Sequence, residues 1–148
     1  MLRALNSNPK GTYRMKFIKD HGGRQKYFPC RFKKDNTNDC VIRAISIATD
    51  QDYMKVWRDL FRLGTEAGRM PNDTTCYEPY LTSLGWVKHS PLKKGKRKLK
   101  VKNFPIKNGA VIIHTCNHLT TILHGELHDT WNTGEYAANS YYTHISLN

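Results

Sequence analysis

Three residues of this 148-residue chain are of the types that together carry out nucleophilic catalysis: Cys40, His118 and Asp129. A cysteine attacks a carbonyl carbon only as the thiolate, so it needs a base that takes its proton and an acceptor that orients that base. Histidine is the usual base, and a carboxylate is a usual orienting group. The sequence therefore offers a nucleophile, a general base and an orienting acid, provided that the fold brings them together.

Cys40 stands at the start of a predicted buried helix. The residues that follow it are almost continuously apolar over 41–48, and the helix is expected to end near Thr49. Asn38 or Asp39 is expected to cap it, because a short polar side chain can accept the free backbone N–H groups of the first turn. The partial positive charge of a helix N-terminus favours a thiolate, so this placement suits a nucleophile.

His118 and Asp129 lie on a predicted β-hairpin with a two-residue turn at His124-Gly125. That turn makes the two residues diagonal neighbours, with backbones roughly 7–8 Å apart, a separation that their side chains can close. Because side chains alternate along a strand, both point to one face together with Trp131, and His128 points to the other. A three-residue turn would break this parity, so the prediction depends on the turn.

The remaining elements are expected to be helices before residue 85 and strands after it. An amphipathic helix is expected from Tyr53 to a stop at Gly64, followed by a loop over 65–75 and a short helix over 76–84. Besides the hairpin, short strands are expected over 86–90, 109–115 and 141–145. This order indicates an α+β fold with N-terminal helices packed on a C-terminal antiparallel sheet. We expect one domain over 28–148 behind a basic N-terminal arm over 1–27.

The order of these parts resembles that of the papain-like cysteine peptidase superfamily, and most closely its compact bacterial and phage-encoded members, such as the bacteriocin-processing peptidases. Those proteins carry a Cys on the first core helix, a His that begins a later strand and an Asp or Asn on the next strand. The resemblance covers about residues 36–131. It implies a papain-like fold in which Cys40 is the nucleophile, His118 the general base and then acid, and Asp129 the group that orients the imidazole. Trp131 resembles the tryptophan that shields the histidine–acid pair from water.

Two details concern the nucleophile segment. Cys40–Ile45 is also similar to the nucleophile segment of ovarian-tumour-type deubiquitinases, although Leu119 stands where that family usually has an aromatic residue. Papain-like peptidases usually place a Gln shortly before the Cys to bind the developing oxyanion, and Lys34 stands there. Asn36 and Asn38 are the nearest amides, and either is a candidate donor beside the backbone N–H of the nucleophile. Alternatively, Asn38 is only a helix cap and the oxyanion site is built elsewhere.

The chain is strongly basic, with 24 Lys and Arg against 12 Asp and Glu and a net charge of +12. The positive charge is concentrated in residues 1–34 and 86–107. Basic surfaces attract polyanions such as nucleic acid or ribosomes, and contacts to phosphates without sequence readout are expected here. The alternative is that these side chains only solvate a surface hairpin. The predicted contact residues are Lys93, Lys94, Lys96, Arg97, Lys98, Lys100 and Lys102.

No cofactor, metal or membrane is predicted for the chain. His114, Cys116 and His118 could form a zinc site as an alternative to catalysis, but no CxxC or HExxH spacing is present. No apolar run approaches the roughly 18 residues that a membrane span needs, and the first residues lack the apolar stretch of a secretory signal. The protein is therefore expected in a cytoplasm, that of the host if it is phage-encoded, with its four cysteines as thiols.

Two functions remain open from the sequence. The first is a cysteine hydrolase, a peptidase or isopeptidase that cleaves an amide bond in a protein or peptide substrate, or a related acyltransferase. The second is a non-enzymatic basic binding protein on a papain-like scaffold, with nucleic acid, a ribosome or a host protein as its partner. The two differ at Cys40, which only the enzyme needs for function.

Overall fold

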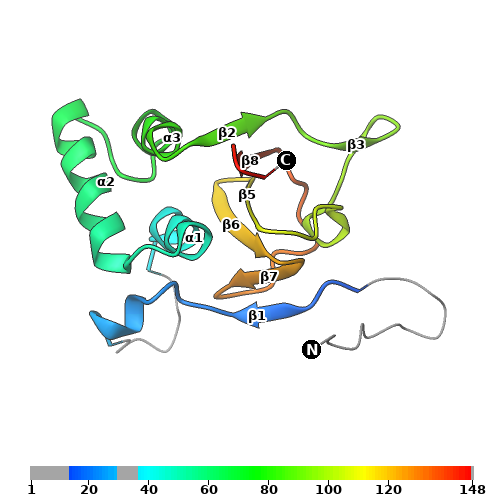
Figure 1. The fold of residues 1–148 in the computed structure, drawn as a ribbon, viewed down its shortest axis with the longest axis horizontal. Coiled ribbons are helices and arrows are strands. Elements are labelled where there is room, and N and C mark those ends of the chain that lie inside the picture. Colours follow the sequence, from blue (N-terminus) through cyan, green and yellow to red (C-terminus); the bar gives the residue numbers. More distant parts are fainter. Residues whose placement is uncertain (1–13, 30–36, 148) are drawn as a thin grey trace.

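A computed structural model describes residues 14–29 and 37–147 of the chain. No helix in these two ranges is both long and apolar enough to span a bilayer. The fold is α+β, with helices on one side of a mostly antiparallel sheet (Figure 1). The helices are α1 (Cys40–Thr49), α2 (Tyr53–Ala67) and α3 (Thr74–Ser83). The strands of the sheet are β1 (Phe17–Lys19), β2 (Trp86–His89), β5 (Ala110–Thr115), β6 (His118–Leu123), β7 (Glu126–Asp129) and β8 (Ser140–His144).

The sheet has the strand order β1-β7-β6-β5-β8-β2. Within it, β1 is parallel to its neighbour β7, and the other pairs are antiparallel. The turn between β6 and β7 has two residues, His124 and Gly125, both with positive φ (49° and 77°). It pairs Leu123 with Glu126, so the predicted hairpin register is confirmed.

Both faces of the sheet are buried under a hydrophobic core. Because side chains alternate along a strand, β5 contributes residues to both cores. Ile112 belongs to the core on the helix side, which α1, α2 and α3 complete. Val111 and Ile113 belong to a second core on the opposite face, together with Val101 and Phe104. Figure 1 shows the helices on one side of the sheet and the short helix η2 (Val101–Asn103) on the other. Packing from both sides fixes the strands that carry His118 and Asp129.

The expected end of the second helix is wrong. α2 does not stop at Gly64 but continues to Ala67, and its C-cap is Gly68 with a φ of 65°. A Cβ at Gly64 would lie 2.5 Å from the Arg69 carbonyl oxygen, so glycine is needed there for close packing. The basic stretch after β2 forms a short hairpin of β3 (Lys93–Lys94) and β4 (Arg97–Lys98) before η2.

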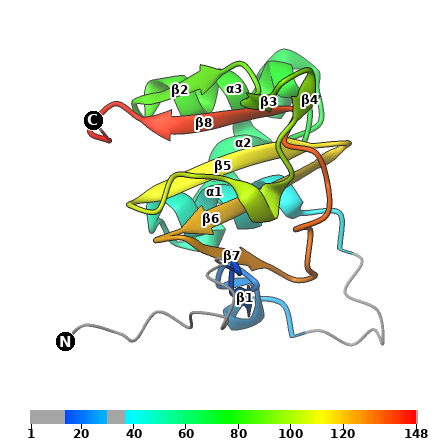
Figure 2. The same cartoon turned by 90° about the vertical axis from the view of Figure 1, so that its right-hand side faces the viewer.

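Part of the predicted basic arm packs against the domain. β1 adds to the edge of the sheet beside β7, and η1 (Arg24–Lys26) follows it (Figure 2). Nη1 of Arg24 lies 2.9 Å from Asp39 Oδ2 and 2.9 Å from the Tyr53 hydroxyl. These bonds tie η1 to the residue that precedes the predicted nucleophile.

Candidate active site

The structure brings Cys40, His118 and Asp129 together at one end of the sheet. Cys40 is the first residue of α1, His118 the first of β6 and Asp129 the last of β7. His118 Nε2 lies 2.7 Å from Asp129 Oδ2, and His118 also shares a hydrogen bond with the Cys40 thiol. The three residues singled out from the sequence are therefore in direct hydrogen-bonding contact.

The hydrogen bonds give the two ring nitrogens of His118 different roles. Because an ionised carboxylate only accepts hydrogen bonds, Nε2 carries a hydrogen and donates it to Asp129. By elimination, Nδ1 is the nitrogen that takes part in the hydrogen bond between His118 and the Cys40 thiol. Asp129 Oδ1, in turn, accepts from the backbone N–H of Thr130 at 2.7 Å. The carboxylate is thus held at both oxygens, and it fixes the imidazole in one orientation.

The pKa values of the thiol and the imidazole shift in opposite directions. Burial alone would raise the pKa of Cys40, because it disfavours the thiolate. Hydrogen bonds from His118 and the Leu119 backbone favour the thiolate, as do the charges of His118 and Arg43. Together they outweigh burial and hold the pKa of Cys40 below its ordinary value. Burial lowers the pKa of His118, but its hydrogen bonds to Asp129 and Cys40 and their negative charges raise this pKa to about 9. These shifts favour a thiolate–imidazolium pair, the reactive form of a cysteine nucleophile.

The first turn of α1 is not capped as the sequence suggests. Asp39 occupies the N-cap position, but its side chain accepts no hydrogen bond from the backbone of the first turn. Its carboxylate is 3% exposed and is bound by Arg43, by Arg24 and by the Tyr53 hydroxyl, the last at 2.5 Å. The expected capping role of Asp39 is wrong because these donors compete for both of its oxygens. The side chain of Asp39 therefore leaves the N–H groups beside Cys40 to other acceptors.

Arg43 links two buried carboxylates beneath the site. Its Nη1 pairs with Asp39 Oδ1, and its Nη2 lies 3.6 Å from Asp129 Oδ1. The side chain is 6% exposed, and its Nε is buried without a hydrogen-bond partner among the described residues. Arg43 was not among the residues expected at the site, although one signal was available in the sequence: a charge inside an apolar helix needs a buried partner.

We expect Arg43→Met to lower the free energy of unfolding by about 3 kcal/mol, because it leaves the buried Asp39 without its closest counterion. Urea denaturation measures the effect. Arg24→Met is the matched control: Arg24 binds the same carboxylate, but its side chain is more exposed (19% against 6%), so we expect a smaller loss. Equal losses in the two variants would show that burial of Arg43 does not decide the effect.

Trp131 covers the imidazole from the solvent side. Its ring centroid lies 5.1 Å from that of His118, at an interplanar angle of 49°. Tyr136 packs edge-on against Trp131 at 5.3 Å. Trp131 remains 42% exposed, so it contacts His118 and still borders the solvent. This is the place that the family resemblance implies for a shielding tryptophan.

A pocket of about 190 Å³ opens onto Cys40 and His118. Its lining includes the side chain of Tyr77 and two exposed amides, Asn72 and Asn117. Either amide is a candidate donor to an oxyanion formed at the nucleophile. Neither was expected from the sequence, where only amides that precede the nucleophile were considered. Asn72 comes from the α2–α3 loop and Asn117 from the β5–β6 turn, so only the tertiary fold brings them here.

The structure describes one of the two amides named from the sequence, Asn38, and it does not line this pocket. Asn36 lies outside the described residues. Asn38 is exposed, has a φ of 53° and lines a neighbouring pocket of about 310 Å³ with Trp57 and Phe61. The two pockets share Val41 and Asn72 among their lining residues, so they adjoin each other near the start of α1.

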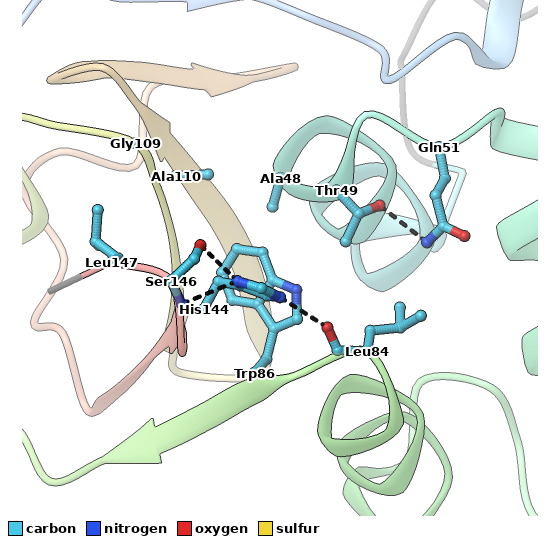
Figure 3. A pocket seen from close by; sticks show the side chains of 10 residues that line it. All are labelled: Ala48, Thr49, Gln51, Leu84, Trp86, Gly109, Ala110, His144, Ser146 and Leu147. Carbon is cyan, nitrogen blue, oxygen red and sulfur yellow. Dashed lines mark hydrogen bonds between the residues drawn. The ribbon is translucent and has the colours of Figure 1, made fainter.

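A larger cavity, of about 380 Å³, lies at the other end of α1, where it is lined by Ala48 and by residues of the C-terminal segment (Figure 3). A helix of ten residues is about 15 Å long, which separates this cavity from Cys40. His144 lies in it, with Nε2 3.0 Å from the Leu84 carbonyl oxygen and Nδ1 2.7 Å from Ser146 Oγ. Both of its ring nitrogens are engaged, so the smaller pocket with the shifted pKa values is the better candidate for an active site.

No group of three or more His, Cys, Asp or Glu side chains within 14–29 and 37–147 is arranged to hold a metal ion. Of the residues considered for zinc, His118 is bonded to Asp129 and Cys40, and Cys116 is an exposed free thiol. His128, expected on the opposite face from His118, pairs with Asp20 at 2.8 Å. The arrangement around His118 therefore suits proton transfer.

Comparison with known proteins finds no relative of this chain. Neither a protein-family model, nor a curated protein, nor a solved structure matches the chain. A function must consequently be inferred from the order of the parts and from the geometry of the site.

Proposed function

We propose that the protein is a papain-like cysteine hydrolase that cleaves an amide bond in a protein or peptide substrate. The observation that carries the proposal is the hydrogen-bonded series Cys40–His118–Asp129, with the pKa of the thiol lowered and that of the imidazole raised. Cys76 shows the contrast: it is buried, its Sγ donates to the Leu60 carbonyl at 3.4 Å, and burial raises its pKa. A cysteine that only fills space in the core needs no histidine base beside its thiol.

The order and placement of the elements support the papain-like assignment. The nucleophile begins a buried helix, the base begins a strand of the sheet and the orienting acid ends the adjacent strand. The helix packs directly on the strand that carries the base. Trp131 beside His118 is a further point of agreement with the family pattern.

In the proposed reaction the Cys40 thiolate attacks the carbonyl carbon of the amide, and the carbonyl electron pair moves onto the oxygen. N–H groups at the start of α1, with Asn72 or Asn117, would donate to that oxyanion. His118 gives its proton to the leaving nitrogen, the C–N bond breaks and a thioester remains. Water then attacks the thioester, His118 takes the proton from this water, and the thiolate leaves. An amine in place of water would make the same apparatus an acyltransferase.

Asp129 has a positioning role in this scheme. It accepts from His118 Nε2–H throughout, so Nδ1 stays directed at the reacting atoms. Its charge also stabilises the imidazolium that forms when His118 holds the proton. Trp131 limits the access of bulk water to this ion pair.

The activated ester p-nitrophenyl acetate tests the proposal, because it acylates a reactive thiol whatever the peptide specificity. We expect a burst of p-nitrophenolate equal to the amount of protein, an acetyl group on Cys40 by mass spectrometry, and steady turnover as water releases it. Cys40→Ala should remove the burst and the turnover. Cys116→Ala, which changes an exposed thiol, should leave both intact. Acetylation spread over the cysteines without turnover would contradict the proposal.

A further inference from the structure

The hairpin formed by β3 and β4, residues 93–98, concentrates positive charge on a very small element. It contains four lysines, one arginine and Gly95, with no acidic residue, and every residue in it is exposed. Gly95 has a φ of 63°, a conformation that suits the turn. Figure 1 shows the hairpin extending away from the sheet. We call this element the basic hairpin.

The register of the basic hairpin sets like charges directly opposite one another. Lys93 pairs with Lys98, and Lys94 pairs with Arg97. Residues opposed in this way have Cβ atoms roughly 4.5–5.5 Å apart, and like charges at that distance destabilise the strand pair. The hairpin therefore carries an electrostatic cost in the free protein that a bound polyanion would relieve.

Neighbouring lysines are neutralised within the chain, whereas the hairpin cations are not. Lys100 and Lys102 both form ion pairs with Glu135, and Lys98 donates to a neutral amide, that of Asn139. In the part of the chain that the structure describes, no acidic side chain pairs with the other four cations of the hairpin. The seven basic residues named from the sequence thus separate into a hairpin group and a pair held by Glu135.

We propose that the basic hairpin binds the phosphate backbone of a nucleic acid duplex without reading its sequence. The hairpin contains no apolar or aromatic residue, whereas protein interfaces are built around such anchors and are depleted in lysine. It also has no aromatic side chain on which the bases of a single strand could stack. A two-stranded ribbon is narrow enough to follow a duplex groove, and its lysines suit phosphates as point charges. Duplex binding by the hairpin does not depend on the chemistry at Cys40.

Fluorescence anisotropy with a labelled mixed-sequence duplex tests this proposal over a range of KCl concentrations. The logarithm of the affinity should fall linearly with the logarithm of the salt concentration, by about 0.9 for each phosphate contact. Replacing Lys94 and Arg97 by glutamine should reduce that slope by about two units and the low-salt affinity by about tenfold. The matched variant, Lys100→Gln with Lys102→Gln, loses the same net charge but should bind nearly as the parent does.

Other measurements separate binding by the basic hairpin from its alternatives. Lys94→Gln with Arg97→Gln should not lower the thermal midpoint, because the change removes a repulsive pair. Cys40→Ala should bind the duplex as the parent does, so this proposal and the hydrolase proposal fail separately. DNA and RNA duplexes in parallel arms show which backbone is preferred. Three results would overturn the proposal. The first is an equal loss of affinity in the two double variants, and the second is no binding by the parent at low salt. The third is that polyglutamate displaces the labelled duplex as effectively, per charge, as unlabelled duplex does.

Discussion

Replacing His118 with alanine is expected to slow acylation of Cys40 by p-nitrophenyl acetate about 10- to 100-fold at pH 6. An ordinary thiol, with a pKa of about 8.5, has well under 1% thiolate at this pH. In the parent, His118 has its pKa raised to about 9, so at pH 6 it holds the proton that the thiol gives up. The expected factor is smaller than the gain in thiolate, because a thiolate of low pKa is a weaker nucleophile.

The pH dependence distinguishes this effect from structural damage. The deficit of His118→Ala should shrink above pH 9, where an ordinary thiol is ionised and the imidazole of the parent has lost its proton. His128→Ala is the matched control, since His128 lies on the neighbouring strand and pairs with Asp20 instead of with the site. A deficit in His118→Ala that is the same at every pH would contradict a role for His118 in activating the thiol.

Asp129→Asn is expected to reduce turnover by a factor on the order of 10³ or more, although the two side chains have nearly the same shape. Oδ1 faces two donors, the Thr130 N–H at 2.7 Å and Arg43 Nη2 at 3.6 Å. The oxygen of the new carboxamide will therefore occupy that position, and its NH₂ group will face His118 Nε2. The imidazole must then carry its hydrogen on Nδ1, where it can no longer accept the proton of the thiol.

Burst kinetics measure the loss, and nitrogen NMR of His118 reports the tautomer. We expect the neutral ring in Asp129→Asn to be protonated at Nδ1 and that of Cys40→Ala to be protonated at Nε2. Glu126→Gln, on the same strand as Asp129, serves as the control, because its carboxylate lies near His128 and away from the site. If Asp129→Asn keeps most of the parent's turnover, the carboxamide has rotated and the proposed orientation by Thr130 and Arg43 is wrong.

The contact between His118 and Asp129 could be predicted because it depends on local sequence. Residues His124 and Gly125 select a two-residue turn, and that turn fixes which side chains share a face. The start of α1 at Cys40 was predictable in the same way, from the apolar run that follows it. The contact between Cys40 and His118, which are distant in sequence, came only from the order of parts in a known family.

The features that were missed depend on tertiary packing. Gly64 resembles a helix stop, but it lies within α2, where the Arg69 carbonyl leaves no room for a Cβ. Arg43 interrupts an apolar run, and its partners Asp39 and Asp129 are visible only once α1 rests on the sheet. Asn72 reaches the pocket of the nucleophile through a loop whose path no local pattern determines.

The pH dependence of Cys40 alkylation in the folded parent tests the central claim most directly. Limiting iodoacetamide is added at each pH, and each modified cysteine is identified by mass spectrometry. We expect rapid labelling of Cys40 at pH 6, well ahead of labelling of the exposed Cys116 and the buried Cys76. The rate of Cys40 labelling should change again near pH 9, as His118 loses its proton. A single rise at the pKa of an ordinary thiol, about 8.5, with Cys40 no faster than Cys116, would contradict the thiolate–imidazolium pair and the hydrolase with it.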